Sequence, residues 1–316
     1  MFALGAALCA LLAAPAARAG DNDLALWKLG HPDAITICTI CDGSDNTISP
    51  GDPTAQTRFA RMASSLGLAF VPGFGDQAST TGQAGFEIGY SQSLRFLSLN
   101  NNEWATDGSQ ATVAPPGALA LSTLTVRKGI GGSFELGVFA TYLAESQMLS
   151  LGAQVRAALI DGIDYAPDLS LRAYGMRVTG TRELDLTIAG GDVMISKSFG
   201  VAGAIKLQPY GQYGMVLINA NTTVINFNPG AQDAANPTAQ DDVFQDIHML
   251  DNRYNRVAAG LRLVAGAAVV GLEANYAFGT NPVQYSPLST PVNGSTTPPT
   301  QSTHMLGIDA HVGVQF

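Results

Sequence analysis

The chain has 316 residues, which is longer than an average domain but within the range of a single large all-β domain. Only 13% of its residues are charged while 46% are hydrophobic, and this composition excludes a disordered acidic chain, which would be highly charged and poor in apolar residues. A net charge of −9 argues against binding to nucleic acid or to anionic membrane surfaces. After the N-terminal apolar run, no apolar stretch approaches the roughly 20 residues that a membrane-spanning helix needs.

The N-terminus carries the features of an export signal. Residues 2–14 form an apolar run, and Ala17-Arg18-Ala19 supplies the small-x-small pattern that signal peptidase reads. We therefore predict a signal peptide over residues 1–19, followed by a mature chain that passes through the periplasm.

Residues 20–83 are predicted to form a periplasmic cap or plug. Asp52 followed by Pro53 is typical of a helix start, and Gly67 is a plausible end. Between them, apolar residues recur at helical spacing, namely Ala55, Phe59, Met62, Ala63 and Leu66. We expect a short amphipathic helix that covers or plugs the periplasmic mouth of the following domain.

Cys38 and Cys41 form the only CxxC pair of the chain. In the oxidising periplasm such a pair favours a small structural disulfide. A zinc site would need two further ligands, of which only His31 is nearby, and a redox role would need an α/β domain that the sequence does not indicate. We expect no metal and no cofactor.

From residue 84 onward the dominant periodicity is two, which predicts β-strands. In residues 133–142, for example, Phe134, Leu136 and Val138 share one face while Glu135 and Gly137 share the other. The predicted strands cover residues 84–97, 118–128, 132–144, 148–159, 168–178, 184–198, 202–219, 254–265, 267–279 and 304–316. These are about ten strands, and the alternative is twelve, with two more before residue 84.

The polar face of these strands indicates what kind of β protein this is. It carries Gly, Ser, Gln and Asn with few charges, whereas a soluble sandwich would expose many Lys and Glu side chains. Apolar residues facing lipid and small or polar residues facing a lumen are typical of a transmembrane barrel. The sequence therefore predicts an all-β fold, an antiparallel transmembrane β-barrel over residues 84–316, and a soluble sandwich or barrel is the alternative.

The last predicted strand alternates apolar residues with small or polar ones. Its apolar positions are Leu306, Ile308, Ala310, Val312, Val314 and Phe316. This segment resembles the final strand of Gram-negative outer-membrane β-barrel proteins, which typically ends in an aromatic residue, usually Phe; Val314 departs from the pattern, because an aromatic residue is common there. The resemblance implies that Val312, Val314 and Phe316 form the signal read by the barrel assembly machinery. It also implies an outer-membrane location, in contact with membrane lipid and lipopolysaccharide.

Charged residues of both signs fall on the predicted lumen face. They are Glu87, Arg95, Glu135, Arg156, Arg172, Asp185, Lys206, Arg256, Arg262, Glu273 and Asp309. A barrel of about ten strands is narrow enough for side chains to fill it, so we expect opposite charges to pair across a blocked lumen. The long connections, at residues 99–117, 221–253 and 280–303, are expected at one rim and the short turns at the other.

Three functions remain open from the sequence. The first is a structural or surface-binding barrel, or a narrow channel for small solutes. The second is a substrate-specific transporter, for instance of apolar molecules, for which Gly190, Gly191 and Pro209 mark places where a strand could break. The third is an outer-membrane hydrolase using His248 or His304, but neither stands in a recognisable motif, so we expect no enzyme activity. The small-molecule ligand is unknown.

Overall fold

The computed structural model describes most of the chain from the N-terminal helix onward. The described residues are 24, 26–29, 55–73, 75, 77–97, 117–131, 133–163, 165–201, 205–227, 241–279 and 303–316. The predicted signal peptide, Cys38 and Cys41 lie outside them. Among the described residues, no helix is both long and apolar enough to cross a membrane.

Two helices precede the strands in the described chain. The elements are η1 (Leu26–Leu29), α2 (Ala55–Phe70), β1 (Phe86–Phe96), β2 (Ala118–Gly129), β3 (Phe134–Leu143), β4 (Leu149–Ile160), β5 (Asp168–Thr179), β6 (Leu184–Ser196), β7 (Phe199–Val201), β8 (Ile205–Thr222), β9 (Ile225–Asn226), β10 (Asp241–Asp242), β11 (Arg253–Ala265), β12 (Ala268–Gly279) and β13 (His304–Gln315). The ten strands predicted from the sequence correspond to β1 to β6, β8 and β11 to β13. The twelve-stranded alternative is wrong, because β1 pairs directly with β13 and ten strands close the barrel.

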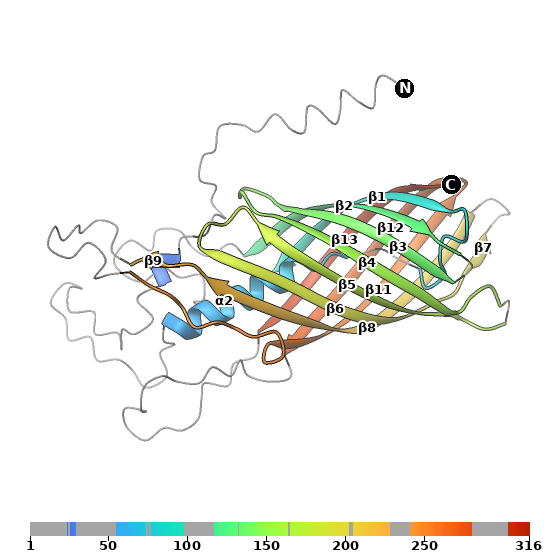
Figure 1. The fold of residues 1–316 in the computed structure, drawn as a ribbon. Helices are drawn as coiled ribbons and strands as arrows, with labels where there is room; N and C mark the ends of the chain where they lie inside the picture. The colour runs from blue at the N-terminus through green and yellow to red at the C-terminus, as the bar shows by residue number, and fades with distance from the viewer. Residues whose placement is uncertain are drawn as a thin grey trace, which may run out of the picture.

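Ten antiparallel strands close into a barrel (Figure 1). Each strand pairs with its neighbours in chain order, and β11 returns to pair with β8. Pairing between β1 and β13 joins the two ends of the sheet. The short strand β7 adds to the edge of β8, while β9 and β10 form a separate two-stranded piece. Closure leaves no free edge along the barrel wall, which removes the aggregation risk that edge strands carry.

Side chains alternate along each strand between the lumen and the outer surface. In β1, Glu87, Ser91 and Arg95 are buried inside, while Ile88 and Leu94 are exposed outside. The same exposed apolar set recurs on the other strands, for example Leu124, Leu136, Val155, Leu171, Tyr213, Leu261, Leu272 and Ile308. The barrel therefore has an apolar outer wall around a filled interior.

The two rims of the barrel differ in their connections. One rim carries the connections β1–β2, β8–β11 and β12–β13, together with the turns β3–β4 and β5–β6, and we call it the long-connection rim. The other carries β2–β3, β4–β5, β6–β8 and β11–β12, and we call it the short-turn rim. The C-terminus lies at the short-turn rim, where Phe86 and Phe316 each donate a backbone hydrogen bond to the other, at 2.8 and 2.9 Å (Figure 1).

The strand breaks considered for a transporter do not form. Strand β6 pairs with both neighbours through Gly190 and Gly191, and β8 continues through Pro209, which faces outward opposite Leu261. Gly190 instead makes room, because a Cβ atom there would lie 2.4 Å from the hydroxyl of Tyr174. The strand is therefore continuous here, and Gly190 leaves space for the side chain of Tyr174.

Helix α2 lies inside the barrel at the long-connection rim, with β9 and η1 beside that mouth (Figure 1). The sequence predicts a helix at the opposite mouth, next to the short turns. The reason for the difference is that the inward face of the barrel is apolar only near the long-connection rim, so only there can an apolar helix be buried. The expected end at Gly67 is also wrong, because the helix continues to Phe70.

Candidate functional site

The half of the lumen nearest the long-connection rim is apolar and holds α2. Every described side chain of this helix except Arg58 is buried, which is expected for a helix enclosed on all sides. The wall around it is built from inward residues of the surrounding strands, including Leu119, Leu121, Leu143, Met176, Val178, Leu186, Ile188, Val216, Ile218, Ala277 and Met305. We call this region the apolar half.

The β8–β11 connection covers helix α2 at the long-connection rim. The rings of Phe59 and Phe244 stack with centroids 4.7 Å apart. Gln56 and Gln245 exchange two hydrogen bonds, in which the Gln56 amide donates to the Gln245 carbonyl at 3.1 Å and the Gln245 N–H donates to the Gln56 side chain at 2.9 Å. Deeper in, the hydroxyl of Ser64 lies 3.1 Å from the side-chain oxygen of Asn252. These contacts fasten the helix to the connection above it.

The same side of β6 faces inward along the whole strand, but its residues change to apolar ones where β6 enters the apolar half. Its first part turns Leu184, Leu186 and Ile188 inward, so Asp185 faces outward. Asp185 pairs there with Arg177 at 2.6 Å, and the two side chains are 43% and 66% exposed. The expectation that Asp185 faces the lumen is therefore wrong, because we assumed one polar inward face along the whole strand.

The other half of the lumen is filled by charged side chains, and we call it the charged half. Glu87 accepts from Arg127 and, at 2.6 Å, from Arg262. Because β1 and β11 are not neighbours in the sheet, the Glu87–Arg262 contact spans the lumen. Glu135 lies 3.6 Å from Arg127 and 3.4 Å from a third guanidinium, that of Arg156.

A second group of pairs fills the remainder of the charged half. Asp309 accepts two bonds from Arg95, at 2.8 and 3.0 Å, and a third from Asn275 at 2.6 Å. Glu273 accepts from Arg256 at 2.9 Å, and Asp192 pairs with Arg172 at 2.5 Å. The lumen ion-pair network thus consists of Glu87, Arg95, Arg127, Glu135, Arg156, Arg172, Asp192, Arg256, Arg262, Glu273 and Asp309. The imidazole Nε2 of His311 lies 3.5 Å from the carboxylate of Glu87.

Most of the predicted lumen charges belong to this network, and two do not. Asp185 is outside, as described above. Lys206 has the inward parity but is exposed, because it lies near the start of β8 at the short-turn rim, where β7 pairs with it. Arg127, Asp192 and His311 were missed, although alternation with Thr125, Met194 and Asp309 would have placed each on the inward face.

An extended segment, of which residues 71–73, 75 and 77–83 are described, leads from α2 through the charged half. Arg95 donates to the carbonyl oxygen of Val71 at 3.0 Å, and the N–H of Gly75 donates to Glu273 at 3.3 Å. Carboxylates and guanidinium groups of the network thereby satisfy main-chain groups that would otherwise be buried without partners.

Further toward the short-turn rim the same kind of contact continues. Arg156 donates to the carbonyl oxygen of Gln77 at 3.1 Å, and the N–H of Thr81 donates to Glu135 at 2.9 Å. The N–H of Thr80 lies 3.4 Å from Asp161 in the β4–β5 connection, a carboxyl whose pKa is raised by burial. We call α2 and residues 71–83 together the plug.

Two glycines of the extended segment fit tightly against β13. A Cβ atom at Gly73 would lie 2.1 Å from the carboxyl carbon of Asp309. Gly75 has a φ of +57°, a conformation that favours glycine, and a Cβ atom there would lie 2.9 Å from His311. The segment therefore passes close to the wall of the charged half, with no space for side chains at these two positions.

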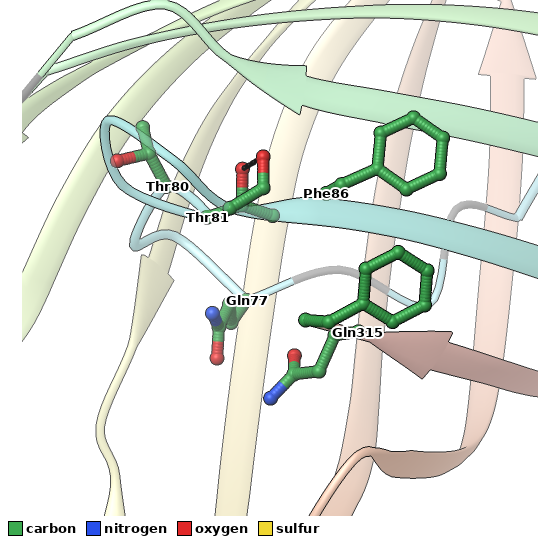
Figure 2. A pocket seen from close by; sticks show the side chains of 7 residues that line it. Gln77, Thr80, Thr81, Phe86 and Gln315 are labelled. Atoms are coloured by element: carbon green, nitrogen blue, oxygen red, sulfur yellow. Dashed lines mark hydrogen bonds between the residues drawn. The ribbon is translucent and has the colours of Figure 1, made fainter.

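A pocket of about 220 Å³ lies where the segment reaches the short-turn rim. Its lining residues are Gln77, Thr80, Thr81, Gly85, Phe86, Gln315 and Phe316 (Figure 2). The rings of Phe86 and Phe316 stack with centroids 5.6 Å apart, so one side of the pocket is formed where β1 pairs with β13. The side chains in it are amides, hydroxyls and aromatic rings, without a charged group.

The histidines considered for hydrolysis lie in different surroundings. His248 is exposed in the β8–β11 connection. His304 is exposed on the outer wall, where its ring stacks on Tyr276 and lies 3.2 Å from the tyrosine hydroxyl. No group of three or more His, Cys, Asp and Glu side chains within the described part of the chain is arranged to hold a metal ion.

Comparisons with known proteins return outer-membrane barrels at low similarity. Ail of Yersinia pestis is 13% identical, with 74% of this chain and 99% of that chain covered and a TM-score of 0.23. The outer membrane protease OmpT of Escherichia coli is 9% identical, with 75% and 97% covered and a TM-score of 0.34. Neisserial surface protein A is 12% identical, with 73% and 94% covered and a TM-score of 0.28. No protein-family model and no curated protein matches the chain.

Proposed function

We propose that this protein is an outer-membrane β-barrel with a closed lumen, which acts as a structural or surface-binding barrel and conducts no solute. The observation that carries this proposal is the plug, because helix and extended segment together fill the lumen from the long-connection rim to the short-turn rim. Apolar side chains surround α2 in the apolar half, and ion pairs and bonds to the plug backbone fill the charged half.

The outer surface supports the membrane location. Exposed apolar side chains cover the wall, which would be unfavourable in water over so large an area. Aromatic residues lie near both rims, with Tyr142 and Tyr276 toward the long connections and Phe134 and Phe316 toward the short turns. Such belts are typical of membrane–water interfaces, where an aromatic ring meets lipid head groups. In this arrangement Val312, Val314 and Phe316 face lipid and are available to the assembly machinery.

Conductance in planar lipid bilayers tests the closed lumen. We expect the full-length protein to insert without producing a steady channel, because the paired charges of the network and the plug leave no continuous aqueous path. A large and steady conductance in most insertions would contradict the proposal.

Fractionation of cells should recover the protein with the outer membrane, and recovery in the soluble periplasm would contradict the location.

A matched pair of helix variants makes the conductance test specific to the plug. In Gly67→Leu the added side chain would collide with Ile218, from which even a Cβ atom would be only 2.8 Å away, so we expect intermittent openings. Arg58→Leu changes the least buried described position of the same helix, and we expect it to remain closed. Equal conductance of the two variants would show that the helix does not gate the lumen.

A further inference from the structure

We infer that the barrel carries its own N-terminal segment through the lumen, so that Leu26–Leu29 stands on the same side of the outer membrane as the long connections, the cell surface. This inference rests on the proposed outer-membrane location. It reverses the sequence-based expectation that residues 20–83 stay in the periplasm, and it makes the barrel a scaffold that displays a segment of its own chain.

The order of contacts along the plug shows a single pass through the lumen. Ser64 contacts Asn252 at the long-connection rim, and Gly75 contacts Glu273 midway along β12. The N–H of Ala78 then donates to Ser196, the last residue of β6 at the short-turn rim, at 2.9 Å. Successive plug residues therefore meet wall residues that lie progressively farther from the long connections, before β1 returns in the opposite direction.

The start of the described chain is anchored at the long-connection rim. The N–H of Leu26 donates to the carboxylate of Glu183 at 3.0 Å, in the turn between β5 and β6. Arg58 of α2 donates to the carbonyl oxygen of Leu29 at 3.4 Å, and both leucines are buried in the apolar cluster. Helix η1 and the beginning of α2 therefore share one rim, and the lumen below them is occupied by the plug itself.

The charged half holds the plug chiefly through main-chain groups of the plug. Its side chains bond main-chain oxygen and N–H groups of the plug, at Val71, Gly75, Gln77, Ala78, Ser79, Thr80 and Thr81. The wall also restricts the side chains of the plug, because it leaves no space for a Cβ atom at Gly73 or Gly75 and buries Val71 and Ala78 almost completely. The lumen thus fits this segment through both its main-chain groups and its small, buried side chains.

Site-specific labelling with a membrane-impermeant maleimide on intact cells tests the inference. In a background with Cys38 and Cys41 replaced by serine, single cysteines are placed by Trp27→Cys, Leu250→Cys and Tyr165→Cys, at positions 38%, 72% and 93% exposed. Leu250 marks the long-connection rim and Tyr165 the short-turn rim. We expect positions 27 and 250 to be labelled on intact cells, and position 165 only after permeabilisation. Labelling of position 27 together with 165 and apart from 250 overturns the inference.

Disulfide trapping in the purified full-length protein separates failure of the inference from failure of the membrane proposal. In the same background we expect Ser64→Cys with Asn252→Cys, and Ala78→Cys with Ser196→Cys, to form disulfides on mild oxidation. The mismatched pair of Ser64→Cys with Ser196→Cys should not. If positions 165 and 250 label alike on cells, the outer-membrane location fails, and the trapping pattern still decides the path of the chain. Trapping of the mismatched pair in preference to the matched pairs overturns the inference.

Discussion

The two halves of the lumen hold the same plug by different physical means. The apolar half buries a helix by shape, with Phe59 stacked on Phe244 and Gly67 against Ile218. The charged half binds an extended chain through hydrogen bonds from paired charges to its backbone, as between Arg95 and Val71. Packing therefore holds the helix and hydrogen bonds from buried charges hold the segment that follows it, so substitutions in the two halves should have different consequences.

Removing a charge from the charged half should have the largest effect. In Asp309→Asn the guanidinium of Arg95 loses its paired carboxylate while remaining buried, and breaking such a pair costs about 3–5 kcal/mol. The free energy of unfolding, measured by urea titration of the folded barrel in detergent, should fall by that amount. A loss no greater than that of a surface pair would show that water reaches this part of the lumen.

Truncation in the apolar half should loosen the helix and leave the wall intact. Phe59→Ala removes a fully buried ring, and such truncations cost about 3 kcal/mol or more. Hydrogen exchange of α2 should accelerate while the strand amides remain protected. Arg58→Ala is the control on the same helix turn; it removes only a half-buried side chain and its bond to Leu29, so it should accelerate exchange of α2 far less than Phe59→Ala. If the barrel strands also exchange faster in Phe59→Ala, the helix is part of the wall's own folding unit.

The close approach of helix and wall predicts an intermediate effect with a specific rescue. Gly67→Ala would place a Cβ atom 2.8 Å from Ile218, and overpacking of this kind costs about 1–3 kcal/mol. Ile218→Ala removes the colliding atoms, so the double variant should recover part of the loss seen in Gly67→Ala. A double-mutant cycle of unfolding free energies measures this coupling, and strictly additive losses would contradict the contact.

The smallest effect is expected at the exposed pair on the outer wall. Arg177 and Asp185 are 66% and 43% exposed, and such pairs contribute about 1 kcal/mol or less. Asp185→Asn should therefore change the unfolding free energy far less than Asp309→Asn, and the small difference should vanish at high salt because screening weakens exposed pairs. Equal losses for the two aspartates would remove the distinction between wall and lumen.

Strand positions could be predicted from the sequence because alternation is a local signal. All ten predicted segments correspond to barrel strands, and the apolar pattern before Phe316 belongs to β13, which closes the barrel against β1. The helical spacing of Phe59, Met62 and Leu66 likewise predicted α2. However, helical spacing predicts only which faces of the helix are apolar. It does not predict at which rim the helix is buried.

The site was harder to predict because the inward side chains are apolar in one half of the lumen and charged in the other. The prediction for Asp185 was wrong because Leu184, Leu186 and Ile188 point inward and cover α2. These residues have the same inward parity as Asp192, and that shared parity was the available signal. The backbone contacts of residues 71–83 leave no periodic trace in the sequence. Only Gly73 and Gly75 hint at a close passage, and glycine is too frequent in this chain to mark it.

Hydrogen exchange of the extended segment tests most directly that a continuous plug closes the lumen. The N–H groups of Gly75, Ala78 and Thr81 donate to Glu273, Ser196 and Glu135 inside the charged half. In the folded wild-type protein we therefore expect peptides covering residues 71–81 to exchange as slowly as the barrel strands. Exchange as fast as that of the exposed β4–β5 connection would contradict a closed, threaded lumen.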